Sequence, residues 1–218
     1  MGKLYYWLLK KTSRPQERGQ PSSGHWQSLA RQAALELISP GQGSMLEIGC
    51  GEGFFLKSLP DSYGKVFGID LSAQQLSRAS VNLKGARRAS TLQADAASLP
   101  FKDNSFDTVV CVNVFMNIGS DPAVFAALGN INRVCKTGGR LVLDVRNKLN
   151  PAVFLKYGLV GFYDTTIDAG HLRAYDPGKF VKILAEFGFE LSRLKTIGFP
   201  WGRFAPIHVI EAVKRRRI

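Results

Sequence analysis

The segment LEIGCGEGFF, residues 46–55, constrains the fold more than any other part of this 218-residue chain. An apolar run is interrupted there by three alternating glycines, Gly49, Gly51 and Gly53, before a helical pattern begins. Glycine reaches positive φ at little steric cost and has no Cβ, so the backbone can turn tightly and a ligand can approach bare peptide. The pattern predicts a strand, a ligand-binding turn and a helix, although an ordinary tight turn would also account for glycines alone.

A second acidic position supports the ligand-binding interpretation. KVFGID, residues 65–70, is predicted as a short buried strand that ends in Asp70, roughly twenty residues beyond the glycines. A carboxylate at that distance can accept hydrogen bonds from the two vicinal hydroxyls of a ribose. A helix N-cap is the alternative role, but Ser72 is the better N-cap candidate for the helix that follows. We therefore expect Asp70 to bind ribose.

The spacing of the glycines separates two classes of cofactor. A dinucleotide fingerprint requires G-x-G-x-x-G, and its third glycine position, counted from Gly49, is occupied by Phe54. This mismatch disfavours a nicotinamide-dependent oxidoreductase. Glu47 followed by the alternating glycines instead resembles the first motif of the class I S-adenosylmethionine-dependent methyltransferases. The resemblance continues in order through residues 44–145, and it is greatest to methyltransferase type 11 and to the quinone-biosynthesis methyltransferases.

The order of the predicted elements indicates an α/β fold. Strand-like and helical runs alternate after residue 44, which predicts a mainly parallel sheet covered by helices on both faces. The expected strands are 44–49, 65–70, 90–94, 106–112, 140–145, 190–197 and 208–213, and the expected helices are 26–39, 54–59, 72–83, 123–134 and 180–187. The last two strands should pair antiparallel, because a short connection with Gly and Pro joins them. The resemblance implies a Rossmann-like, doubly wound sheet of seven strands, with the antiparallel C-terminal strand beside the fifth.

Three functional regions are expected along the chain. Residues 1–43 are predicted as an N-terminal helical cap and linker, and residues 44–218 as the S-adenosylmethionine-binding methyltransferase domain. Residues 147–170 contain several aromatic residues and are expected to form a substrate lid. The run LYYWLLKK, residues 4–11, is typical either of peripheral contact with an anionic membrane or of a helix packed on the domain.

The charge of the chain leaves a second class of function open. The formal net charge is +12, and basic residues cluster at both ends. Such clusters attract nucleic-acid phosphates, so a nucleic-acid-binding protein or RNA methyltransferase is the alternative. However, residues 214–217 lack interleaved aromatics, which favours a solvated tail. Asn113 is also not followed by the Pro-Pro-aromatic cluster of enzymes that methylate amino groups of nucleic acids. We expect a small-molecule or lipid-like acceptor.

The remaining composition is that of an ordinary globular protein. The three cysteines have no C-x-x-C spacing, so neither a zinc site nor a disulfide framework is expected, and no metal is predicted. No stretch approaches the roughly 20 apolar residues of a spanning helix, and the N-terminus lacks the features of a signal peptide. These features predict a cytoplasmic protein. The sequence does not indicate an oligomeric state.

The resemblance assigns cofactor contacts to four strand ends. Glu47 is expected to organise the methionine ammonium, Asp95 with Ala96 to meet the adenine edge, and Asn113 with Val114 to border the methionine tail and reacting methyl group. Other roles stay open: a buried carboxylate satisfied by backbone donors for Glu47, a turn cap for Asp95 and core packing for Val114. The full predicted set is Glu47, Gly49, Cys50, Gly51, Gly53, Asp70, Leu71, Asp95, Ala96, Asn113 and Val114.

His171 is the candidate catalytic residue. A hydroxyl acceptor of high pKa benefits from a general base, for which histidine is the usual residue. His171 lies in AGHLRAYDPGKF, where Asp176 and Pro177 form a sound N-cap and N1 pair, so it can equally brace the loop before the helix. His25 and His208 have weaker claims, because His208 lies within a predicted strand.

Overall fold

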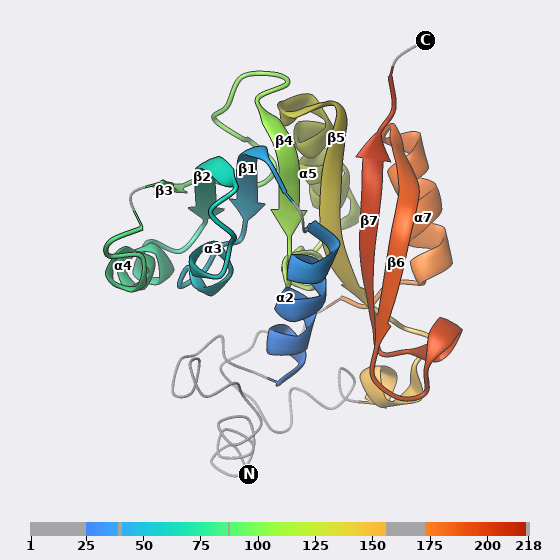
Figure 1. Ribbon diagram of the computed structural model, residues 1–218. Helices are drawn as coiled ribbons and strands as arrows, with labels where there is room; N and C mark the ends of the chain where they lie inside the picture. Colours follow the sequence, from blue (N-terminus) through green and yellow to red (C-terminus); the bar gives the residue numbers. More distant parts are fainter. Residues whose placement is uncertain (1–24, 39–40, 87, 156–172, 217–218) are drawn as a thin grey trace.

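The strands form one seven-stranded sheet in the order β3-β2-β1-β4-β5-β7-β6 (Figure 1). The computed structural model describes residues 25–38, 41–86, 88–155 and 173–216. The strands are β1 (Gly43–Ile48), β2 (Tyr63–Asp70), β3 (Ala89–Gln93), β4 (Phe106–Cys111), β5 (Cys135–Arg146), β6 (Phe189–Ile197) and β7 (Ile207–Lys214). The first five pair in parallel, and β7 pairs antiparallel with both β5 and β6. The predicted fold class is confirmed, including the last strand inserted beside the fifth.

Helices cover both faces of this sheet (Figure 1). They are α2 (His25–Ile38), α3 (Phe54–Lys57), α4 (Ala73–Asn82), α5 (Asp121–Val134) and α7 (Pro177–Glu186), with 3-10 turns η2 (Phe115–Asn117) and η4 (Gly202–Phe204). The central strands are apolar on both sides, as parallel strands between two helical layers must be. Met45 packs with α2, α3 and α4, while its neighbour Leu46 packs with α5 and α7. The core therefore consists of two layers, one on each side of the sheet.

Local sequence explains where the main helices begin. Ser72 is the N-cap of α4, and its hydroxyl accepts a hydrogen bond from the backbone N–H of Gln75 at 3.3 Å. Asp176 caps α7 as predicted, since its Oδ1 accepts from the N–H groups of Gly178 and Lys179 at 2.9 and 3.2 Å. Each cap satisfies donors that have no partner within the helix. Among the described helices, none is both long and apolar enough to span a bilayer.

The fifth strand begins earlier than the sequence predicted. We expected a turn at the glycine pair and a strand from residue 140, but β5 starts at Cys135. Phe106 pairs with Cys135 and Thr108 with Arg140, so the register shifts between these two pairs. Gly138 has φ of +76° within the irregularity, a conformation that glycine adopts without strain. The glycine pair thus forms a bulge inside the strand.

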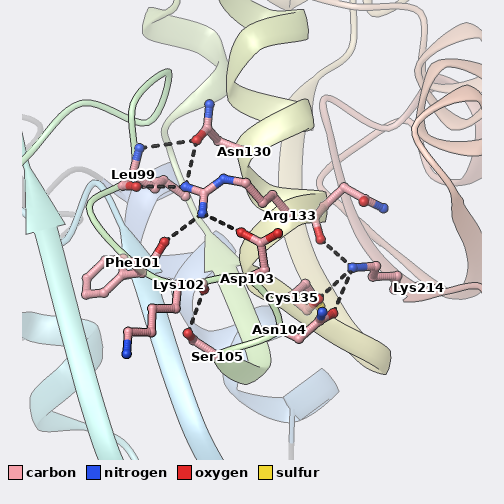
Figure 2. Close-up of polar contacts among 11 residues, drawn as sticks. Leu99, Phe101, Lys102, Asp103, Asn104, Ser105, Asn130, Arg133, Cys135 and Lys214 are labelled. Carbon is pink, nitrogen blue, oxygen red and sulfur yellow. Dashed lines mark hydrogen bonds and ion pairs between the residues drawn. The ribbon is translucent and has the colours of Figure 1, made fainter.

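The basic C-terminal run also differs from the prediction of a solvated tail. Lys214 ends β7, and its ammonium donates hydrogen bonds to the carbonyls of Asn132 and Cys135 at 2.6 and 2.8 Å (Figure 2). These carbonyls lie at the C-terminal end of α5, where unpaired acceptors and the helix dipole favour a cation. The side chain of Arg215 is half-exposed and pairs with Glu190 at 3.3 Å. The prediction is therefore wrong for Lys214, which has a structural partner.

Candidate functional site

The carboxyl ends of β1, β2, β3 and β4 meet at one edge of the sheet. Ile48 pairs with Ile69, and Asp70 pairs with Gln93, so the segments after these strands are neighbours. Ligands of open α/β sheets bind beyond this edge. The structure therefore brings the predicted cofactor-binding residues, which lie at or just after the ends of these four strands, to one edge.

The glycine turn after β1 has the conformation that its sequence requires. Gly49, Gly51 and Gly53 have φ of +71°, +51° and +79°. The N–H groups of Gly49 and Cys50 both donate to the carbonyl of Ile69, at 2.7 and 2.9 Å. A Cβ on Gly49 would come within 2.5 Å of the Val114 side chain, whereas a Cβ on Gly51 would meet nothing closer than 4.0 Å. Gly49 therefore allows the turn to pack closely against Val114. At Gly51, in contrast, the backbone faces open space.

Asp70 joins this turn to β2. Its Oδ2 accepts from the N–H of Gly51 and its Oδ1 from the N–H of Ser72, both at 2.9 Å. Because Ser72 is the N-cap of α4, Asp70 does not have the alternative capping role. Leu71 follows as an exposed apolar side chain, and its carbonyl accepts from Gln93 at 2.9 Å. The carboxylate is thus held at the sheet edge with a nonpolar surface next to it.

Asp95 caps the turn that follows β3. Its Oδ1 accepts from the N–H of Ala97 at 2.8 Å, and its carbonyl accepts from the N–H of Ser98 at 3.0 Å. Asp95 is exposed, and Ala96 is half-buried against the core. The capping role left open by the sequence is therefore present. It engages Oδ1 of this exposed carboxylate.

The loop that carries Asp95 is anchored by the side chains of α5 (Figure 2). Arg133 donates through Nη1 to the carbonyl of Phe101 at 2.6 Å and through Nη2 to that of Leu99 at 2.8 Å. It also pairs with Asp103 at 3.0 Å. Asn130, one turn earlier, donates to the carbonyl of Ala97 at 2.7 Å. A planar guanidinium with several donors can fix several loop carbonyls at once. Arg133 thus anchors the segment that follows the Asp95 turn, and it donates to Asn130 Oδ1 at 3.1 Å, so it also holds the side chain that contacts the turn.

Beyond β4, a buried ionic network holds the chain in an unusual conformation. Asn113 has φ of +63°, in the left-handed region that Asn tolerates better than most residues. Its N–H donates to Asp144 Oδ1 at 2.5 Å, and its Oδ1 accepts from Arg146 Nη2 at 2.6 Å. Arg146 and Asp144 are both buried and form an ion pair at 3.3 Å. The network sets the path of Asn113 and the following Val114 beside the glycine turn.

Glu47 is the most electrostatically perturbed of the predicted residues. Its side chain is only 3% exposed, and burial raises the pKa of the carboxyl to about 8, against the opposing effect of the Arg31 charge. One oxygen, Oε2, has no hydrogen-bond partner among the described residues. A buried acceptor without a donor is unfavourable, and a cationic donor such as an ammonium would satisfy it and stabilise the ionised form.

Several residues of this edge were missed or lie elsewhere. The sequence analysis missed three buried charged residues, Arg31, Asp144 and Arg146. The signal that could have indicated them is their position within an otherwise apolar helix face or strand. Cys50 is also buried, and burial raises the pKa of its thiol. His171, the predicted general base, lies outside the described residues, as does most of the expected lid.

The fold is that of a doubly wound α/β protein, and the candidate ligand site lies beyond the carboxyl ends of β1 to β4. Residues 46–143 match the family described as "Methyltransferase domain". The match covers a little under half of the chain and confirms, over these residues, the resemblance predicted from the motifs.

Relatives of known sequence agree with this match, and a solved structure shares the fold. The chain is 37% identical over 117 residues to 2-methyl-6-phytyl-1,4-hydroquinone methyltransferase of Synechocystis, and 36% identical over 104 residues to demethylmenaquinone methyltransferase of Lactococcus lactis. These matches cover 53% and 45% of this chain but only 36% and 40% of the two relatives. N-methyltransferase NodS of Bradyrhizobium japonicum, in complex with S-adenosyl-L-homocysteine, shares the fold with a TM-score of 0.72 at 17% identity, over 97% of this chain and 98% of that one.

Proposed function

We propose that this protein transfers a methyl group from S-adenosylmethionine to a small-molecule or lipid-like acceptor. The observation that carries the proposal is the unpartnered, buried Oε2 of Glu47 at the end of the strand that leads into a turn without side chains. An ammonium group is the complement of that oxygen. A bulky ligand can also lie against the open backbone at Gly51.

The other strand ends would hold the remaining parts of the cofactor. Asp70 would accept from the ribose hydroxyls, while Leu71, Asp95 and Ala96 would border the adenine, whose exocyclic amine suits an acceptor-only carboxylate. Asn113 and Val114 would border the methionine tail and the reacting methyl group. Bound S-adenosylmethionine supplies an electrophilic methyl on a sulfonium. The protein's contribution is then to align the acceptor and exclude water.

A lipid-like phenolic compound is the acceptor class that we favour. The two relatives above are named for a phytyl hydroquinone and a demethylmenaquinone, both apolar acceptors. The described surface offers Phe154, Phe199 and Trp201 to solvent, with 73–74% of each side chain exposed. Exposed aromatics beside an overall positive charge suit peripheral contact with an anionic membrane. Three buried, free cysteines suit a reducing cytoplasm.

Calorimetric titration with S-adenosylmethionine and with S-adenosylhomocysteine tests the cofactor part of this proposal. We expect both to bind the full-length protein, and Asp70→Ala to weaken each by roughly 10- to 100-fold, because hydrogen bonds to a charged group are lost. The matched control is Asp61→Ala, since Asp61 is fully exposed and forms a surface ion pair with Arg88. Binding of NADH in place of both compounds, or equal affinity in the two variants, would contradict the proposal.

A further inference from the structure

A pocket lies between α7 and the edge strand β6, on the face of the sheet that carries α5 and α7. Its volume of about 670 Å³ falls within the usual range of ligand pockets, roughly 300–1,000 Å³. It is lined by Leu149, Asp176, Pro177, Gly178, Val181, Lys182, Leu191, Leu194, Thr196, Gly202, Arg203 and His208. None of the predicted cofactor-binding residues contributes to it.

The pocket exists because α7 covers the edge of the sheet incompletely. Phe180 and Leu184 of α7 are buried in the core, whereas Val181 lies one position further round the helix and lines the pocket. On β6, Leu191 and Leu194 line the same space and stay exposed. Apolar side chains from a helix and a strand therefore surround a space that no described side chain fills.

His208 places one polar group in this apolar lining. The residue is only 4% exposed, and its Nδ1 has no hydrogen-bond partner among the described residues. Nε2, in contrast, lies 3.5 Å from the side-chain nitrogen of Asn147. Asn147 itself is held by the carbonyls of Arg203 and Ala205 at 2.8 and 2.9 Å. A fixed imidazole with one unsatisfied nitrogen is thus built into the pocket.

Burial favours the neutral form of this imidazole. Burial lowers the pKa of His208, so the ring is uncharged at neutral pH. Asp176 also lines the pocket, but its Oδ1 is engaged by the N–H groups of Gly178 and Lys179. Lys182 and Arg203 are the cations of the lining, and the Arg203 guanidinium lies 5.8 Å from the Phe204 ring centroid.

We infer that this pocket binds an apolar small molecule that carries a hydroxyl group, with the hydroxyl hydrogen-bonded to Nδ1 of His208. A neutral imidazole nitrogen is a donor in one tautomer and an acceptor in the other. A hydroxyl both donates and accepts, so it satisfies Nδ1 in either tautomer, whereas a carboxylate only accepts. The aliphatic lining would bury the rest of the molecule. This site is separate from the cofactor site and does not depend on the proposed function.

The test compares 1-naphthol with 1-fluoronaphthalene, which has a similar size but no hydroxyl hydrogen. Both are titrated into the full-length protein, and the ¹⁵N resonance of the His208 side chain is followed by NMR. We expect 1-naphthol to bind at least about fivefold more tightly, because only it satisfies the buried nitrogen, and to shift the Nδ1 resonance. Equal affinity of the two compounds, no binding of 1-naphthol, or binding without a shift at His208 would overturn the inference.

Two variants locate the binding. His208→Phe should abolish the preference for 1-naphthol, and Leu194→Arg, at the exposed side of the pocket, should weaken both compounds at least fivefold without burying a charge. Leu92→Arg is the matched control, since Leu92 is a similarly exposed leucine on the opposite edge strand β3. Equal effects of Leu194→Arg and Leu92→Arg, or a dimer that Leu194→Arg dissociates in sedimentation, would overturn the assignment. Titration with S-adenosylhomocysteine in the same samples tests the cofactor proposal independently.

Discussion

Glu47 and Asn113 show how single residues at the carboxyl edge depend on charges buried beneath them. Glu47 lies in β1, and its charge interacts with that of Arg31 on α2. Asn113 is held at positive φ by Asp144 and Arg146, both from β5. Neither arrangement stabilises the fold efficiently, since a buried charge must be compensated by its partners. Such perturbed groups are typical of sites that bind or react with ligands.

Replacement of Glu47 by Gln should change how stability depends on pH. The folded pKa of about 8 lies above the ordinary value of 4.5, so between these values the folded state holds a proton that the unfolded chain has lost. The free energy of unfolding is therefore highest below pH 4.5. It falls as the pH rises towards about 8, by up to about 1.4 kcal/mol per pH unit. Urea unfolding of the wild type at pH 5, 6, 7 and 8 should show this slope, and Glu47→Gln should flatten it.

The exposed Glu190 provides the control for this experiment. It forms a surface ion pair with Arg215, and such pairs contribute little to stability. Glu190→Gln should leave the pH slope of the wild type unchanged. If Glu47→Gln and Glu190→Gln gave the same slope as the wild type, Glu47 would be ionised in the folded protein throughout this range, and its burial would not control its protonation.

At the scale of elements, α5 determines where the Asp95 turn lies. Arg133→Lys keeps the positive charge but replaces a planar group with a point donor, which cannot reach the carbonyls of Leu99 and Phe101 together. We expect the affinity for S-adenosylhomocysteine to fall about tenfold, because the turn proposed to meet adenine loses its anchor. Calorimetry measures the affinity, and urea unfolding measures the accompanying loss of stability.

Arg88 is a matched control for Arg133. It also donates to two loop carbonyls, those of Leu59 and Pro60 at 2.6 and 2.8 Å, and pairs with Asp61. This loop precedes β2 and so lies at the amino end of that strand, whereas the Asp95 turn lies at the carboxyl ends of the strands. Arg88→Lys should therefore reduce stability to a similar extent and leave the affinity for S-adenosylhomocysteine unchanged. A comparable loss of affinity in both variants would mean that reduced stability, and not the position of the turn, explains the effect.

The elements were largely predictable because their signals are local. Alternating apolar runs, the caps at Ser72 and Asp176, and the glycine turn each occupy a few consecutive residues. Arg133 could not be assigned its role in this way, because its partners lie about thirty residues earlier and only the fold brings them close. The early start of β5 was missed for a related reason, since its first pair, Phe106 with Cys135, depends on the neighbouring strand.

At the scale of the whole molecule, chain connectivity gathers exposed aromatics at one end. Two hydrogen bonds hold the start of segment 147–155 against the β6–β7 connection. Asn147 donates to the Arg203 carbonyl and Asn150 to the Phe204 carbonyl, at 2.8 Å each. The exposed Phe199 and Trp201 of that connection are in edge-to-face contact, with ring centroids 5.2 Å apart. The β6–β7 connection adjoins the carboxyl end of β5, because Arg146 pairs with Ile207. A membrane contact here would bring an apolar acceptor near the proposed cofactor edge.

The whole-molecule prediction is that the protein sediments with anionic vesicles through both charge and these aromatics. Phe199→Ser with Trp201→Ser should reduce sedimentation with phosphatidylglycerol-containing vesicles at least fivefold, since aromatic burial in the interface is lost. Phe125→Ser, which changes an exposed phenylalanine of α5, is the control and should have no effect. Raising the salt concentration should weaken binding of the wild type only partly, because aromatic burial is not screened. Unchanged sedimentation of the double variant, together with RNA retention that falls steeply with salt, would instead favour a nucleic-acid partner bound by charge.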